Sequence, residues 1–161
     1  MRQSTIDAIK KEHAAYPQCR GFPAESPAVI EAAEKRLGVV FSDDYREFLT
    51  TFGGCSVGRR TVYGIRLPVR FHESKTYNEK NNFCYLVEDA TMHYRNQKWS
   101  GVDSWYVVSV DCSGNPIGIA SDGTVWIFDH NQMKSEKIHN SFEDWINEDC
   151  LAVEEDDDEE S

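Results

Sequence analysis

Three oxygen-bearing side chains at alternate positions, Asp111, Ser113 and Asn115, have the spacing of the first ligands in an EF-hand calcium loop. That loop needs glycine at its sixth position and a bidentate glutamate at its twelfth. Pro116 and Asp122 stand at these two positions here. A tight turn, in which an Asp or Asn side chain accepts hydrogen bonds from nearby backbone N–H groups, explains the same residues. We therefore expect a turn and no calcium site.

Nucleophilic or metal-dependent catalysis would require other groups. Cys112 and His130 are a thiol and an imidazole, but nothing in their sequence context supports a catalytic pair. The chain contains no GxSxG, no HExxH and no phosphate-binding glycine loop. None of the five histidines lies four residues from another, the spacing that places two metal ligands on one helix face. The sequence predicts no catalytic residue, no metal and no cofactor.

The cysteines stand apart from one another. The chain has five, an odd number with no CxxC pair: Cys19, Cys55, Cys84, Cys112 and Cys150. Neither structural zinc nor a disulfide framework is predicted from such a set. The sequence also has no apolar run near the roughly 20 residues of a membrane helix and no charged-then-apolar signal segment. We expect a cytoplasmic protein with reduced thiols and no membrane association.

The charge is strongly acidic and unevenly distributed. The net charge is −11, and the unbroken run Glu154–Glu160 contributes −7 of it, which leaves −4 for the rest. Such a run repels itself and cannot pack. We expect one domain over residues 1–153 and an acidic, disordered tail over residues 154–161, which either only keeps the protein soluble or steers a partner. Direct nucleic-acid binding is not expected, because phosphates are negative too.

Helical patterns dominate the first third of the chain. Ser4, with Asp7 three residues on, predicts a capped first helix. Ser26-Pro27 predicts the start of a second helix, which stops at Gly38. A third helix is expected over Ser42–Phe52, with Ser42 as its cap and apolar residues at i, i+3, i+4 and i+7 on one face. Among these residues Phe48 and Leu49 are expected in the core.

Strand patterns follow in the middle of the chain. Short apolar runs separated by glycine-centred turns predict antiparallel strands, and Trp126 in one of them is expected in the core. The residues around Gln132–Lys137 predict a loop, and Ser141 with Asp144 predicts a capped final helix. Because the strands are apolar on both faces, the sheet needs helices on one face and loops, the N-terminal segment or a partner on the other. The strands are expected at Val62–Arg66, Trp105–Val110, Pro116–Ile119 and Thr124–Phe128, and the final helix at Phe142–Ile146.

Helices first, antiparallel strands next and a closing helix predict a single α+β domain with a mainly antiparallel sheet flanked by helices. The same motifs, in this order over roughly residues 26–150, resemble the SUKH superfamily. One departure is Val40-Phe41-Ser42, where that family commonly shows Leu-Pro. The residues that carry the resemblance are Leu37-Gly38, Tyr45, Phe48-Leu49, Gly53-Gly54, Gly114 to Ile117, Gly123 with Val125, and Phe142.

This resemblance implies an immunity protein of bacterial polymorphic toxin systems, which binds and blocks a cognate toxin domain without catalysis. Such toxins are often nucleases, which tend to be basic, and an acidic inhibitor would be steered to them. The family also includes regulatory proteins of fungal cell-wall synthesis, so a scaffold module that binds several partners is the alternative. An enzyme is disfavoured because no cluster of titratable groups is evident. Candidate contact residues are Asp43, Asp44, Asp103, Asp122 and Asp129, although each of these acids has the position of a helix-start or turn residue.

Overall fold

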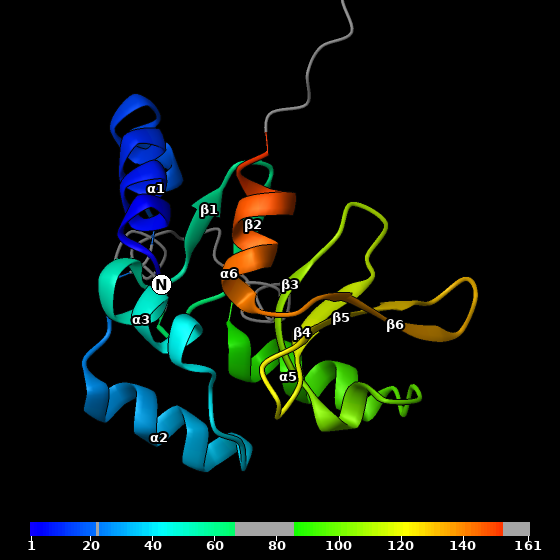
Figure 1. The fold of residues 1–161 in the computed structure, drawn as a ribbon. Helices are drawn as coiled ribbons and strands as arrows, with labels where there is room; N and C mark the ends of the chain where they lie inside the picture. The colour runs from blue at the N-terminus through cyan, green and yellow to red at the C-terminus, as the bar shows by residue number, and fades with distance from the viewer. Residues whose placement is uncertain (22, 67–85, 153–161) are drawn as a thin grey trace, which may run out of the picture.

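The first part of the chain is helical. The computed structural model describes residues 1–21, 23–66 and 86–152. Its N-terminal helices, shown from blue to cyan in Figure 1, are α1 (Gln3–Ala15), α2 (Pro27–Leu37) and α3 (Asp43–Phe52). The acidic run and Cys84 lie outside the described residues.

The helix ends show which predicted caps form. The Oγ atom of Ser26 accepts a hydrogen bond from Val29 N, and Gly38 ends α2 in the left-handed conformation with φ +67°, both as predicted. The predicted caps at Ser4 and Ser42 are wrong. Helix α1 begins after Arg2 without a side-chain cap, and Ser42 stands at the start of α3 but makes no cap hydrogen bond. For α3, the two carboxylates in the first turn, Asp43 and Asp44, interact favourably with the helix dipole instead.

The strands form two antiparallel sheets. A two-stranded sheet pairs β1 (Cys55–Val57) with β2 (Arg60–Val62). After α5 (Val87–Asn96), four strands pair in chain order. The chain then closes with α6 and a single wide helical turn. The bounds are β3 (Tyr106–Val110), β4 (Pro116–Ile119), β5 (Val125–Asp129), β6 (Lys134–His139), α6 (Phe142–Trp145) and the wide turn Ile146–Cys150. The α+β class and the mainly antiparallel sheet are confirmed.

Two strand predictions are wrong in detail. The strand expected at Val62–Arg66 ends at Val62, the last residue of β2, because the next residue bonds elsewhere: Tyr63 N donates to Val108 O of β3 at 2.8 Å. The loop expected at Gln132–Lys137 is largely strand β6. Strand β6 carries charges instead of an apolar alternation because it lies at the sheet edge, where charged side chains discourage pairing with another chain.

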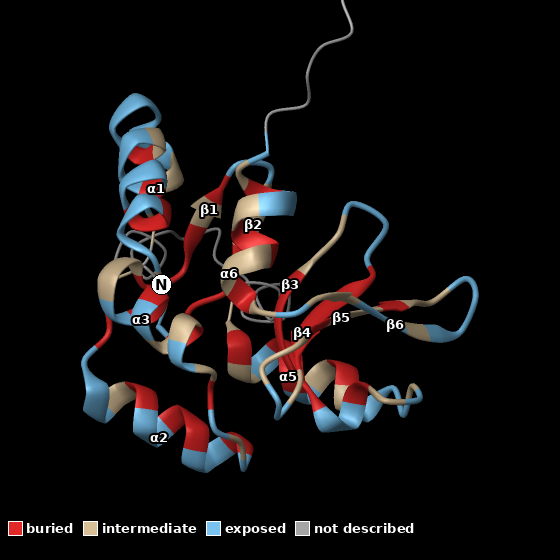
Figure 2. Cartoon of the chain, viewed as in Figure 1, coloured by how far each residue is buried: buried red, intermediate tan, exposed pale blue. Residues whose placement is uncertain are grey.

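Both faces of the four-stranded sheet are covered (Figures 1 and 2). On one face Tyr106 packs against Tyr45 of α3, at 5.7 Å between ring centroids, and Tyr45 packs against Phe142 of α6. On the other face Trp99, in the loop after α5, stacks on Phe128 with centroids 4.7 Å apart. Trp99 in turn packs against Tyr94 of α5, and α5 contacts β3. Helix α5 and the loop after it therefore both contribute to the second cover, for which loops, the N-terminal segment or a partner were expected from the sequence.

The predicted core residues have different outcomes. Phe48 and Leu49 are fully buried on α3, as predicted. Trp126 is only partly buried, because its partner across the ladder is Lys137 of the edge strand, which leaves one side of the indole open. Its ring stacks on Trp105, and its indole N–H donates to Thr124 Oγ1 at 2.8 Å. Trp126 thus covers the sheet at its edge instead of filling the core.

Candidate functional site

A groove of about 660 Å³ opens beside the loop that connects α2 to α3. We call it the α2–α3 groove. Its walls come from four segments of the chain: the end of α2 with this loop, the C-terminal end of α5, residues 103–106 at the start of β3, and the turn between β4 and β5. The lining residues are Glu34, Lys35, Leu37, Gly38, Val39, Val40, Arg95, Asp103, Ser104, Tyr106 and Ser121.

The α2–α3 loop presents an apolar side chain to solvent. Val40 is 77% exposed, the highest value among the exposed large apolar side chains in the described part of the chain. Its neighbour Phe41 is 1% exposed and packs against Tyr45 and Tyr106. The loop is therefore anchored in the core by one side chain while the preceding residue points outward.

Two buried side chains hold the backbone of this loop from inside. The Glu34 carboxylate, on a residue that is 8% exposed, accepts a hydrogen bond from Phe41 N at 2.7 Å and one from Arg46 Nη2 at 2.8 Å. The Tyr106 hydroxyl accepts a hydrogen bond from Ser42 N at 2.8 Å. Burial raises the pKa of Tyr106, so this hydroxyl stays neutral. We call Glu34 and Tyr106 the loop brace; it fixes two consecutive N–H groups directly after Val40.

A guanidinium group lies in the wall of the groove. Arg95 donates from Nη1 to Leu37 O at 3.0 Å and from Nη2 to Trp105 O at 3.1 Å. The first of these carbonyls belongs to the last residue of α2, where a cation interacts favourably with the helix dipole. Burial lowers the pKa of Arg95 while nearby Asp103 raises it. Since a guanidinium keeps its proton in proteins, Arg95 joins the end of α2, as a cation, to the residue directly before β3.

One of the five predicted contact acids lines this groove, and two others follow residues at or beside it. Asp103 lines it, and Asp122 directly follows Ser121, which also lines it. Gly123, in the same turn as Asp122, lies beside Ser42, the residue before Asp43: a methyl group added at Gly123 would be 3.9 Å from Ser42 Cβ. The three acids are exposed. Hydrogen bonds from the Thr124 hydroxyl and backbone N–H lower the pKa of Asp122, so this carboxylate is ionised at neutral pH.

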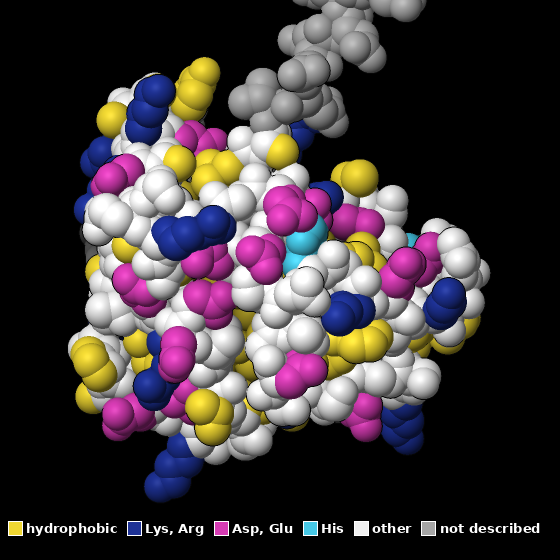
Figure 3. Space-filling view, in the orientation of Figure 1, with side chains coloured by type: hydrophobic (Ala, Val, Ile, Leu, Met, Phe, Trp, Pro, Cys, Tyr) yellow, Lys and Arg dark blue, Asp and Glu magenta, His cyan; other side chains and the backbone are white. Residues whose placement is uncertain are grey.

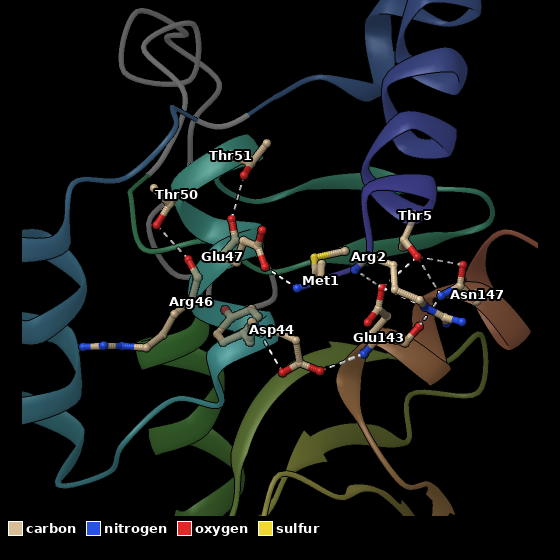
Figure 4. A network of polar contacts seen from close by, with 11 residues as sticks. Met1, Arg2, Thr5, Asp44, Arg46, Glu47, Thr50, Thr51, Glu143 and Asn147 are labelled. Carbon is tan, nitrogen blue, oxygen red and sulfur yellow. Dashed lines mark hydrogen bonds and ion pairs between the residues drawn. The ribbon is translucent and has the colours of Figure 1, made fainter.

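The other two predicted acids lie elsewhere and bond to backbone. Asp44 Oδ2 accepts a hydrogen bond from Glu143 N at 2.9 Å, which joins α3 to the start of α6 (Figure 4). Asp129, at the opposite end of β5 from Asp122, accepts bonds from Asn131 N and Gln132 N in the next turn. Of the five acids, Asp103 lines the groove and Asp122 follows a lining residue, whereas Asp44 bonds to the start of α6 and Asp129 to its own turn.

Around Asp44, a larger polar network connects α1, α3 and α6 (Figure 4). Glu143 Oε1 accepts bonds from Arg2 N at 2.5 Å and from Thr5 Oγ1 at 2.8 Å. Burial raises the pKa of Glu143, but these hydrogen bonds outweigh it and the net shift is downward. The Met1 ammonium also pairs with Glu47. This network holds α1 against α3 and α6.

The residues considered for calcium binding and catalysis make hydrogen bonds that stabilise the local backbone and side-chain conformation. Asp111 Oδ1 accepts hydrogen bonds from Ser113 N at 2.9 Å and Asn115 N at 2.8 Å, the turn expected from the sequence. Asn115 Oδ1 lies 2.6 Å from His130 Nδ1, so an amide, and not Cys112, orients the imidazole. Within residues 1–21, 23–66 and 86–152, no group of three or more His, Cys, Asp or Glu side chains is placed to hold a metal ion.

The buried thiols are poor nucleophiles. Cys55 and Cys150 are 2% and 4% exposed, and burial raises the pKa of both thiols well above the usual value. A thiol with a raised pKa is protonated at neutral pH and reacts slowly. Four cysteines, Cys19, Cys55, Cys112 and Cys150, are free in the described part of the chain. No described helix is long and apolar enough to cross a membrane.

Comparison with known proteins gives one match. The model of the SMI1 / KNR4 family (SUKH-1) matches residues 25–148. This range covers about three quarters of the chain and contains the whole α2–α3 groove, the loop brace and the three acids around them. Helix α1 lies before it. No curated protein matches the chain.

Proposed function

Because the chain belongs to the SMI1 / KNR4 family (SUKH-1), we propose that it is an immunity protein that binds and neutralises a cognate toxin domain. The family match is the observation that carries this function. Membership supports an immunity or regulatory module in general, a class that acts by binding proteins and not by catalysis. Inhibition then results because the bound protein covers the active site or the substrate-binding surface of the toxin.

The charge of the chain supports a basic partner. A net charge of −11 attracts a positively charged domain over distances up to a Debye length, about 8 Å at physiological salt. In Figure 3, Asp and Glu side chains are spread over the visible face and interspersed with Lys and Arg, without one large patch of a single sign. Overall charge thus favours encounter, while local contacts fix the bound orientation. A nuclease fits this description because it must hold phosphates.

We also propose that the protein acts in the cytoplasm of the producing cell, where a nuclease toxin would otherwise reach nucleic acid. The described cysteines are consistent with a reducing compartment. One domain over residues 1–153 followed by the acidic run remains our proposed organisation. The acidic run Glu154–Glu160 contributes −7 to the net charge.

The test uses the toxin domain encoded by the reading frame next to the gene for this chain. Purified protein titrated into that domain should abolish its activity at one inhibitor per toxin, with both chains recovered unmodified. Inhibition by a small fraction of an equivalent would indicate catalysis and contradict the proposal. Binding to several unrelated host proteins, with no effect on the toxin, would support the alternative of a regulatory or scaffold module of the same superfamily.

A further inference from the structure

We propose that Val40 is the apolar anchor of the partner-binding surface, and that the partner presents a shallow apolar socket bordered by Lys or Arg side chains. This inference rests on the proposed function and assigns it to the α2–α3 groove. The surface consists of Val40 and the exposed Asp103, which line the groove, with two further exposed acids next to it in the chain. Asp122 follows the lining residue Ser121, and Asp43 follows Ser42, whose N–H bonds to Tyr106 of the groove wall.

The exposure of Val40 is the first observation. A valine that is 77% exposed buries little apolar surface on folding, and contact with a partner would remove the rest from water. It does not stand alone, because Leu37 and Val39 line the same groove beside it. An apolar side chain surrounded by polar groups is the usual form of an interface centre.

The rigidity of the loop is the second observation. The loop brace accepts hydrogen bonds from the two backbone N–H groups that follow Val40, and Gly38 fixes the other end of the loop by ending α2. The free protein therefore already holds Val40 in one position. A partner that binds a preorganised side chain does not have to order it, so more of the contact energy appears as affinity.

The charges around Val40 define the partner's chemistry. Asp43, Asp103 and Asp122 form no ion pair within 4.0 Å in the part of the chain that the structure describes. Of the two cations in the groove, Arg95 is bonded to backbone carbonyls and Lys35 stands on the α2 side. Besides burial, Asp103 affects the pKa of Arg95, and besides the hydrogen bonds to Asp122, Lys137 affects the pKa of that carboxylate, in both cases without an ion pair. These exposed carboxylates can therefore still form a direct ion pair with a cation of a basic partner.

Substitution at Val40 tests this surface. Val40→Asp adds a charge at an exposed position, so the thermal midpoint should stay near that of the parent protein. The Kd for the toxin domain encoded by the neighbouring reading frame should rise by about 30-fold or more. Met92→Asp makes the same change at another exposed apolar side chain, on α5 and outside the groove, and should change the Kd by less than about twofold. Together these results would support the surface.

Other outcomes separate this inference from the proposed function. If Val40→Asp binds like the parent while the parent still inhibits the toxin, the function stands and the surface is wrong. If Met92→Asp weakens binding and Val40→Asp does not, the interface lies on α5. If the parent does not bind the toxin at all, the proposed function fails and this inference fails with it.

A partner-free measurement tests the rigidity separately. In amide hydrogen exchange of the free protein, Phe41 and Ser42 should be strongly protected although they lie in a loop. Exchange of these two amides at the rate of an open chain would contradict the braced conformation, whatever the toxin experiment shows.

Discussion

Replacing Tyr106 with phenylalanine would remove one half of the loop brace and little else. The ring is 2% exposed and packs against Phe41 and Tyr45, with centroids 4.8 Å and 5.7 Å away, and phenylalanine keeps these contacts. The hydroxyl accepts a hydrogen bond from Ser42 N at 2.8 Å, and its loss leaves that donor without a partner. An unsatisfied buried donor costs about 1–3 kcal/mol.

Thermal unfolding followed by circular dichroism measures this cost. For a chain of this length, 1 kcal/mol shifts the midpoint by about 2–4 °C, so the loss of about 1–3 kcal/mol corresponds to a decrease of roughly 2–12 °C. Protection of the Ser42 amide against exchange should fall more than that of buried strand amides, because the lost bond is local. Tyr16→Phe is the matched control, since the same hydroxyl is removed from a residue that is 56% exposed. An unchanged midpoint and unchanged Ser42 protection in Tyr106→Phe would refute the loop brace.

Three further predictions concern the core, the polar network and the charge. Phe48→Ala should cost about 3–5 kcal/mol, measured by urea unfolding, because it leaves a cavity beside Phe142; unfolding at the parent's urea concentration would contradict the assignment of this helix face. Glu143→Gln should lower the free energy of unfolding at neutral pH. A carboxylate whose pKa is lowered by folding stabilises the fold when ionised, so the gap in unfolding free energy between parent and variant should shrink as pH falls through the lowered pKa of Glu143. A gap that does not change with pH would contradict this. Deleting Glu154–Glu160 should modestly slow association with the toxin domain and leave dissociation nearly unchanged, and added salt should do the same; loss of inhibition on deletion would show that the acidic run is itself the inhibitory element.

The sequence was most informative where one residue type has a strong local preference. Ser26-Pro27 and Gly38 mark the two ends of α2 as predicted, because capping and left-handed backbone are local effects. Strand β6 was missed because edge strands carry charges that match a loop composition. The predicted Ser42 cap fails because of a local competitor: Tyr45 N, the donor that a cap at Ser42 would bind, donates to Asp44 Oδ1 at 2.9 Å instead.

The candidate site was predictable only in part. Asp103 and Asp122 were selected from charge alone, and the fold brings their segments together at one groove. The role of Asp44 depends on α6, which follows 99 residues later and could not be inferred from the local sequence. Val40 was not selected, because two adjacent valines give no sign of which one is exposed. The buried contacts of Phe41 and Glu34 decide that.

Titration of the toxin's activity with this protein tests the central claim most directly. The neighbouring-frame toxin domain, held at a concentration well above the Kd, would be assayed with increasing amounts of parent protein and of the Val40→Asp variant. We predict a linear loss of activity that ends at one equivalent of parent protein, and a shallow curve without that end point for Val40→Asp. Full toxin activity in the presence of excess parent protein would contradict the account.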